Sequence, residues 1–208
     1  MAETNEPLVL IVSGPSGSGK STLVEKILEL PGTMLSVSCT TRPPRKTESD
    51  GKWYTFISED QFRQMVTRDE FLEYAQVFGK HWYGTPRKGV EEARAAKKDL
   101  VLEIDVQGAS QVKKKLPRAE AILILPPSRQ ELERRLRSRG QDSDEAIARR
   151  LEQARREIEC YRDYDYIVVN DQLDRAGQEV QAIVQGQRSS VARNFARVQE
   201  ILNTFGGA

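Results

Sequence analysis

One glycine-rich segment constrains the fold of this chain more than any other feature. Residues Gly14–Ser21, with the sequence GPSGSGKS, fit the pattern G-x-x-x-x-G-K-[ST] in full. The aliphatic run Leu8–Ser13 directly before them is typical of a strand buried on both faces. From Lys20 to about Leu30, apolar residues recur at helical spacing. A strand, a glycine-rich loop and a helix in this order predict an α/β fold.

The segment Gly14–Ser21, called the phosphate loop below, is suited to bind the phosphates of a nucleotide. Glycines let several backbone N–H groups point at one anion, and the helix N-terminus adds partial positive charge. Lys20 is placed to reach β- and γ-phosphates, and the Ser21 hydroxyl can ligate Mg²⁺. The alternative is a glycine-rich turn with an incidental lysine. The loop predicts a nucleoside triphosphate but does not indicate what receives the phosphate.

Aliphatic strand-like runs alternate with helical patterns over most of the chain. Further buried strands are expected at residues 100–105, 121–125 and 166–169, with helices between them. This alternation predicts a doubly wound, mostly parallel sheet. Shorter and more aromatic strands, expected at 35–38, 53–57, 71–78 and 81–83, interrupt the pattern. Residues from about 36 to 83 therefore predict an insertion over one edge of the sheet.

Capping signals predict where several helices begin. Capping boxes, in which Glu or Gln follows the cap by three residues, are expected at Ser58, Ser128 and Asp142. Thr85 before Pro86 predicts an N-cap followed by proline at the first helical position. The last helical pattern runs from about residue 173 to 203, with a break expected around Gly186.

Composition excludes several classes of protein. The chain has 32 Lys+Arg and 31 Asp+Glu, a net charge of +1, which excludes binding of polyanions through net charge and disfavours a nucleic-acid partner. Cys39 and Cys160 lie far apart, which argues against a zinc site or a disulfide framework. The N-terminus has no apolar signal segment, and no apolar run approaches the ~20 residues of a membrane span. We expect a cytoplasmic, reduced protein without a membrane partner.

Three further sets of charged residues are candidates for the site. Arg42 and Arg45 lie on a proline-stiffened loop where their guanidinium groups can converge on a phosphate, although a solvated loop is the alternative. Glu103 and Asp105 end a buried strand, where a carboxylate can support Mg²⁺ or simply cap the next helix. Arginines cluster in residues 134–156, and they form either a solvated helix face or a mobile cationic flap.

At this point the motifs resemble one family closely, bacterial guanylate kinase. They are SGPSGSGKST at 13–22, S-x-x-T-R-P-P-R at 38–45, F-x-E-x-A at 71–75, Y-G-T at 83–85, E-I-D-V-Q-G at 103–108 and V-N-D at 169–171. The resemblance implies transfer of the ATP γ-phosphoryl group to GMP, and to dGMP as well, with Mg²⁺. It also implies a three-layer P-loop fold with core 7–35, 86–127 and 156–208, a GMP-binding insertion 36–85 and a helical lid 128–155.

The resemblance further implies roles for individual residues. The GMP phosphate would be held by Arg42, Arg45, Tyr54 and Tyr83, and the guanine would be read by Ser38, Glu73, Thr85 and Asp105. ATP would be held by Gly14, Pro15, Ser16, Gly17, Ser18, Gly19, Lys20, Ser21, Thr22 and Asn170. Catalysis would fall to Lys20, Arg42, Arg135, Arg139 and Arg150, and Mg²⁺ would be held by Ser21 and Glu103.

Elementary chemistry supports the assignment of Glu73, because a carboxylate can accept from the adjacent N1–H and N2–H₂ donors of guanine, whereas adenine has an acceptor at N1. A solvated carboxylate at a sheet edge is the alternative. Two rival functions stay open: another phosphotransferase of the same fold, and a binding module that has lost catalysis. The C-terminal helix, with Arg188, Arg193 and Arg197 against Glu200, is mildly basic and suited to a subunit contact, so both a monomer and a homodimer are compatible with the sequence.

Overall fold

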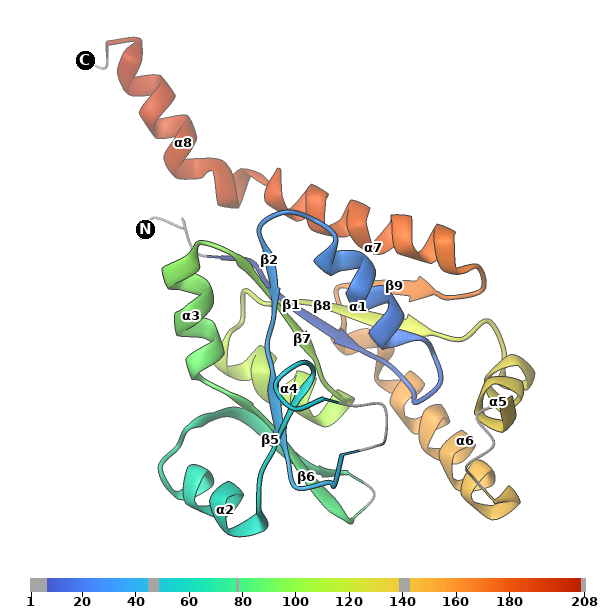
Figure 1. Cartoon of the computed structure of the whole chain (residues 1–208). Coiled ribbons are helices and arrows are strands. Elements are labelled where there is room, and N and C mark those ends of the chain that lie inside the picture. Colours follow the sequence, from blue (N-terminus) through green and yellow to red (C-terminus); the bar gives the residue numbers. More distant parts are fainter. Residues whose placement is uncertain (1–6, 45–48, 78, 139–142, 207–208) are drawn as a thin grey trace.

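A five-stranded parallel sheet forms the centre of the computed structural model, which describes residues 7–44, 49–77, 79–138 and 143–206 (Figure 1). In spatial order its strands are β2 (Thr33–Leu35), β7 (Asp99–Glu103), β1 (Val9–Ser13), β8 (Glu120–Leu125) and β9 (Tyr166–Val169). Every neighbouring pair runs parallel. The mostly parallel α/β sheet predicted from the alternation is confirmed.

Helices cover both faces of this sheet because successive residues of a strand point to opposite sides. On one side, Leu10 and Val12 of β1 pack with α1 (Lys20–Leu28) and α7 (Leu173–Arg188). On the other, Ile11 packs with α3 (Lys88–Ala96) and α4 (Val106–Lys115). All three β1 side chains are fully buried, which places the loop after β1 on a rigid base.

A second, mixed sheet corresponds to the predicted insertion. Its order is β4 (Tyr54–Phe56), β3 (Ser38–Thr40), β6 (His81–Pro86) and β5 (Phe71–Val77), with helix α2 (Glu59–Thr67) packed on it. Only β3 and β4 pair in parallel. The capping box at Ser58 is confirmed, and the rings of Phe62 and Phe71 stack 4.5 Å apart in a small core beside Cys39.

Two helices form the region predicted as the lid. They are α5 (Arg129–Ser138) and α6 (Asp144–Glu159), followed by a short 3-10 turn at Cys160–Asp163. Leu132 and Leu136 of α5 pack against Ile147 and Leu151 of α6, so the pair has its own apolar core. At the predicted cap of α5, Glu131 N donates to Ser128 Oγ over 3.1 Å. A last helix, α8 (Val191–Thr204), follows α7. Among the described helices, none is long and apolar enough to cross a membrane.

Two predicted elements near the insertion are wrong. The strand expected at 35–38 is split, because β2 ends at Leu35 in the parallel sheet and β3 begins at Ser38 in the other. Thr85 is not an N-cap: β6 continues through Pro86, and α3 begins at Lys88. The reason is that Thr85 pairs with Glu73 across the β5–β6 ladder, which overrides the local capping signal.

Three further boundaries differ from prediction. Ser143 caps α6 by accepting from Ala146 N, whereas the predicted cap, Asp142, lies outside the described residues. Strand β7 stops at Glu103, and Asp105 instead caps α4 by accepting from Gly108 N. The C-terminal helix breaks after Arg188, slightly beyond Gly186.

Candidate active site

The phosphate loop connects the end of β1 to the start of α1 at the carboxyl edge of the parallel sheet. Gly14 has φ +144°, and a Cβ there would lie 2.1 Å from the carbonyl oxygen of Ile124 in β8, so only glycine fits. Lys20 Nζ donates to the carbonyl oxygens of Gly14 at 2.6 Å and Pro15 at 3.2 Å. The lysine charge therefore lies directly against the loop backbone.

The two lid helices contact the phosphate loop from its far side. Arg150 Nη1 of α6 donates to Ser16 Oγ at 3.4 Å. Gly17 lies so close to α5 that a Cβ would be 3.0 Å from Leu132 Cδ1. Arg135 of α5 bridges Glu131, at 2.7 Å, and the carbonyl oxygen of Asn170, at 2.8 Å. Its third contact is a 3.4 Å hydrogen bond to the Ser18 carbonyl.

Asn170, which was predicted to bind ATP, has a contact that the sequence did not suggest. The side chain of Asn170 is buried, and its Nδ2 donates to the carbonyl oxygen of Ser18 at 2.8 Å. Asn170 thus supports the loop backbone. Arg134 and Arg135 hold the pKa of Glu131 down at about 2, so this carboxylate stays ionised and fixes the arginine beside it. Arg139 lies outside the described residues.

The predicted metal ligands lie next to each other. Ser21 Oγ donates to Glu103 Oε1 at 2.8 Å. Burial raises the pKa of Glu103, while Lys20 and the Ser21 hydroxyl oppose that rise. Within the described part of the chain, no group of three or more His, Cys, Asp or Glu side chains is arranged to hold a metal ion. One hydroxyl and one carboxylate fit Mg²⁺, which takes few protein ligands and completes its shell with phosphates and water.

A cradle of aromatic rings surrounds Arg42 in the insertion. Its guanidinium carbon lies 5.6 Å from the Tyr54 ring centre and 5.5 Å from that of Phe56. Arg42 Nε donates to the Tyr83 hydroxyl at 3.1 Å. The rings of Tyr54 and Tyr83 meet edge to face at 5.8 Å. A cation and the rings of two tyrosines thus lie together, with the Tyr83 hydroxyl bonded to the cation; Arg45 lies outside the described residues.

Glu73 is a buried acid with a raised pKa in this region. Its side chain is 4% exposed, and its Oε1 accepts from Thr85 Oγ1 at 2.6 Å. Burial raises the pKa of Glu73 to about 7, and Asp105 adds to the rise, while the Thr85 hydrogen bond opposes it. Its other oxygen lies over α4, because a Cβ on Gly108 would be only 2.6 Å from Glu73 Oε2.

A cavity of about 300 Å³ lies between the phosphate loop and the insertion. The predicted residues that line it are Gly14, Ser16, Gly17, Gly19, Lys20, Ser21, Thr22, Ser38, Tyr54, Glu73, Tyr83, Glu103 and Asp105. Arg135 and Asn170 contact the loop at Ser18 rather than lining the cavity, and Thr85 stands behind Glu73. Arg42 and Arg150 do not line it either, but each contacts a residue that does, Tyr83 and Ser16. Most residues predicted on separate motifs therefore meet at one cavity, called the nucleotide cavity below.

Two residues of the predicted lid that lie at the cavity were not predicted from the sequence. Gln153 and Glu157 of α6 both line the nucleotide cavity, and Gln153 Nε2 donates to Glu157 Oε1 at 2.8 Å. Burial raises the pKa of Glu157, and Lys20 opposes the rise. A signal for them existed: together with Arg150 they follow a spacing of three and four residues, which puts all three on one helix face.

Comparisons with known proteins agree with this geometry. Residues 6–187 match a family model described as guanylate kinase. The chain is 46% identical to guanylate kinase of Escherichia coli K12 over 93% of this chain and 94% of that protein. Guanylate kinase of Salmonella typhi shows the same identity and coverage. The crystal structure of guanylate kinase from Anaplasma phagocytophilum superposes with a TM-score of 0.76 and 32% identity, covering 92% of this chain and 91% of that one.

Proposed function

The chain belongs to the guanylate kinase family, and from that premise we propose how its own residues perform the reaction. It is an enzyme that phosphorylates GMP with ATP, giving GDP and ADP. The observation that best supports these residue roles is the environment of Glu73. Glu73 is a buried carboxylate held by Thr85, and it lines the same cavity as the phosphate loop.

We assign the triphosphate to the phosphate loop and the residues around it. Lys20 would bind the β- and γ-phosphates, since its ammonium group already lies against the backbone of the phosphate loop. Arg150, which contacts Ser16, would add positive charge from the lid. Asn170 and Arg135 are positioning residues in this proposal, because both hold the Ser18 carbonyl and with it the shape of the loop.

The GMP phosphate is assigned to the cradle of Arg42, Tyr54 and Tyr83. Arginine can bind phosphate through two hydrogen bonds, and the tyrosine hydroxyls donate without adding charge. The Tyr83 hydroxyl accepts from Arg42, and a phenol that accepts one hydrogen bond can still donate its own proton. Arg45 stays a prediction of the sequence.

The guanine base is assigned to Glu73, with Ser38 and Asp105 beside it in the cavity. An ionised Glu73 accepts from N1–H and N2–H₂ together, an arrangement that adenine cannot match. Thr85 would orient the carboxylate rather than touch the base, since its hydroxyl is already donated to Glu73. These assigned contacts reach the base and the phosphate and none reaches the sugar, so we propose dGMP as a second acceptor.

Mg²⁺ is the proposed cofactor, and Ser21 and Glu103 are the residues that would hold it. Their oxygen atoms lie 2.8 Å apart at the carboxyl edge of the parallel sheet, next to Lys20. When bound, Mg²⁺ neutralises charge on the β- and γ-phosphates. The hydrogen bond between Ser21 Oγ and Glu103 Oε1 holds these two oxygen atoms close together, so the protein offers a preformed pair of ligands.

The transfer itself needs positioning more than acid–base chemistry. The GMP phosphate is a competent nucleophile, and the main barrier is the repulsion between two anions that must meet in line. Lys20 in the nucleotide cavity, Arg42 beside Tyr83 and Arg150 beside Ser16 would reduce that repulsion. Closure of the insertion (36–85) and the lid (128–155) over the core (7–35, 86–127, 156–208) would exclude water that competes for the phosphoryl group. We place this activity in the cytoplasm.

A coupled spectrophotometric assay with GMP, dGMP, AMP and UMP tests the assignment of Glu73. The native protein should use GMP and dGMP, and Glu73→Gln should lower kcat/KM for GMP about 10- to 150-fold, because a hydrogen bond to a charged group contributes about 1.5–3 kcal/mol. The control is Glu70→Gln, since Glu70 lies in the same segment and pairs with Arg68 at the surface. Unchanged discrimination between GMP and AMP in Glu73→Gln would refute the assignment.

A further inference from the structure

Helix α4 lies along the outer edge of strand β5, the strand that carries Glu73 (Figure 1). In the described part of the chain, β5 pairs with β6 on one side and with no strand on the other. Such an edge strand leaves the backbone N–H and C=O groups of alternate residues without a strand partner. The two residues that flank Glu73, Leu72 and Tyr74, direct backbone groups of this kind towards α4.

Two side chains of α4 bind these backbone groups. Gln111 Nε2 donates to the carbonyl oxygen of Tyr74 at 2.9 Å, and Gln111 Oε1 accepts from Tyr74 N at 3.3 Å. The amide of Gln111 thus donates and accepts as the backbone of a neighbouring strand would. One turn further along α4, Lys115 Nζ donates to the carbonyl oxygen of Leu72 at 2.6 Å. The backbone is therefore held on both sides of Glu73.

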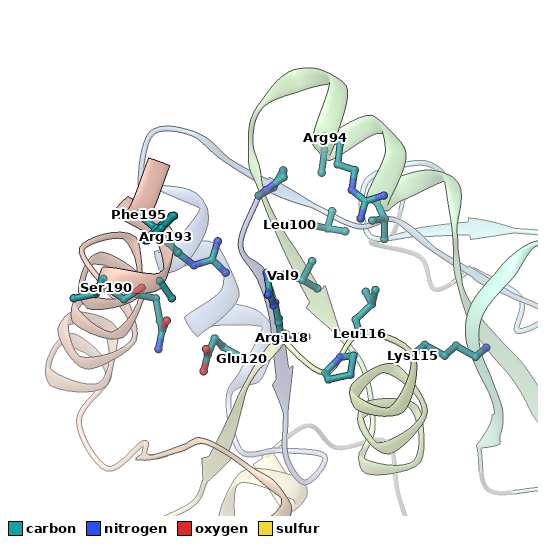
Figure 2. A pocket seen from close by; sticks show the side chains of 18 residues that line it. Val9, Arg94, Leu100, Lys115, Leu116, Arg118, Glu120, Ser190, Arg193 and Phe195 are labelled. Carbon is teal, nitrogen blue, oxygen red and sulfur yellow. The ribbon is translucent and has the colours of Figure 1, made fainter. Parts of the chain in front are cut away.

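Leu72 is anchored to the core of the molecule in a second way. Its side chain is 3% exposed and packs with Ala109 and Val112 of α4 in the apolar cluster on one face of the parallel sheet. Lys115 reaches Leu72 from the rim of the cavity beside helix α8, and Figure 2 shows the lysine side chain extending away from the other labelled residues of that cavity. Although β5 belongs to the insertion, this part of it is fixed to the core.

Helix α4 is in turn fixed to the nucleotide cavity. It begins directly after Asp105, which lines that cavity and accepts from Gly108 N at 2.9 Å. Ala109 and Val112 are buried beside Ile11 of β1, the strand that leads into the phosphate loop. A carboxylate held by α4 therefore keeps a constant position relative to the phosphate loop.

We propose that Gln111 and Lys115 are positioning residues for guanine recognition, which hold the Glu73 carboxylate in the direction that the base requires. The inference rests on the assignment of guanine to Glu73 under the proposed function. Neither residue is among the described residues that line the nucleotide cavity, so both act through Glu73 rather than on the base. The physical gain is preorganisation, because a carboxylate that is already fixed loses little freedom when GMP binds.

Lys115 also acts on the charge of Glu73. Burial is the largest cause of the raised pKa of Glu73, about 7, and hydrogen bonds from Thr85 oppose the rise. Of the charged groups that act on this carboxyl, Asp105 raises its pKa and Lys115 lowers it. Only the ionised carboxyl accepts from both donors of guanine. Lys115 therefore favours the form of Glu73 that reads the base.

Steady-state kinetics of variants of the full chain test the positioning. Gln111→Ala removes both hydrogen bonds to Tyr74 and should raise the KM for GMP about 5- to 100-fold, while kcat and the KM for ATP stay near native. Lys115→Met should raise the KM for GMP about 2- to 10-fold, and Lys115→Arg, which keeps a charged donor, should restore it. The matched control is Lys114→Met, because Lys114 is an exposed neighbour on the same helix. A native KM for GMP in both Gln111→Ala and Lys115→Met overturns the inference, and so does an equal rise in the KM for ATP.

The pH profile separates positioning of Glu73 from general support of the fold. In Lys115→Met, the rise in the KM for GMP on acidification should begin at higher pH, because Glu73 loses a cation that favours its ionised form. Lys114→Met should leave the profile in place, and the shift should vanish in a Glu73→Gln background, since an amide does not titrate there. An increase in KM that is the same at every pH would show support of the strand edge alone and would contradict the role of Lys115.

The outcomes distinguish this inference from the proposed function. If Glu73→Gln keeps the discrimination between GMP and AMP, the assignment of guanine to Glu73 is wrong, and the role of α4 falls with it. If Glu73→Gln loses that discrimination while Gln111→Ala and Lys115→Met bind GMP as the native protein does, the proposed function stands and only the role of α4 is wrong.

Discussion

Replacing Gly108 by alanine should damage guanine recognition through a contact that the sequence does not reveal. Gly108 lies in the first turn of α4, and a Cβ there would be 2.6 Å from Oε2 and 3.0 Å from Cδ of Glu73. The Glu73 carboxylate is buried and held at its other oxygen by Thr85 at 2.6 Å. The added methyl group therefore has to push the carboxylate off Thr85, because the helix backbone cannot move as easily as a side chain.

Two opposing free energies set the size of the effect. Alanine in place of glycine stabilises a helix by about 1 kcal/mol. Loss of the buried hydrogen bond between Thr85 and a charged Glu73 costs about 1.5–3 kcal/mol. The free energy of unfolding of Gly108→Ala should therefore fall by about 0.5–2 kcal/mol. The KM for GMP should rise about 10- to 100-fold, because the displaced carboxylate no longer faces the base.

Urea unfolding and the coupled kinase assay measure these two quantities. The matched control is Gly186→Ala in α7, where a Cβ would meet nothing within 4 Å. That variant should be more stable than the native protein by up to about 1 kcal/mol, with no change in the KM for GMP. If Gly108→Ala behaves like Gly186→Ala, gaining stability and keeping its KM, then Glu73 is not fixed where its role requires and our reasoning fails.

Four other predictions concern the same site. Lys20→Ala should lower kcat by about 10³-fold, because a preorganised charge at the transferring phosphate is lost. Activity within a few-fold of native in the coupled assay would contradict the role of Lys20. The raised pKa of Glu73, about 7, predicts that the KM for GMP rises as pH falls below 7, because only the ionised carboxyl accepts from guanine; Glu73→Gln should flatten this part of the profile. The same pKa means that the folded protein holds this proton more tightly than the unfolded chain, so the Glu73 contribution to stability is full below about 4.5 and is lost as pH rises toward 7. Asn170→Ala should lower the free energy of unfolding in urea by about 1–3 kcal/mol and raise the KM for ATP, because the Ser18 carbonyl loses a buried hydrogen-bond donor. A variant as stable as the native protein would count against the support of the loop by Asn170.

The cavity beside helix α8, lined among others by Val9, Leu100 and Phe195, shows the limits of local sequence patterns. The sequence indicated that the C-terminal helix is suited to a subunit contact. It gave no sign of the cavity beside it, because the walls come from α3, α4 and α8, which are far apart in the chain. The exposed fractions of Val191 and Phe205 likewise follow from the direction in which α8 leaves the fold after Arg188.

Short runs of sequence were enough to predict the phosphate loop, the parallel sheet and the family. Each of these features depends on residues that are close in sequence: a loop of eight residues, the spacing of apolar side chains within a strand or helix, and short motifs. Only the folded chain shows that Thr85 donates to Glu73 instead of capping a helix, and that Gly108 lies against the same carboxylate. Strand register and helix packing bring such residues together across long stretches of chain, and no short-range pattern encodes a contact between partners so far apart.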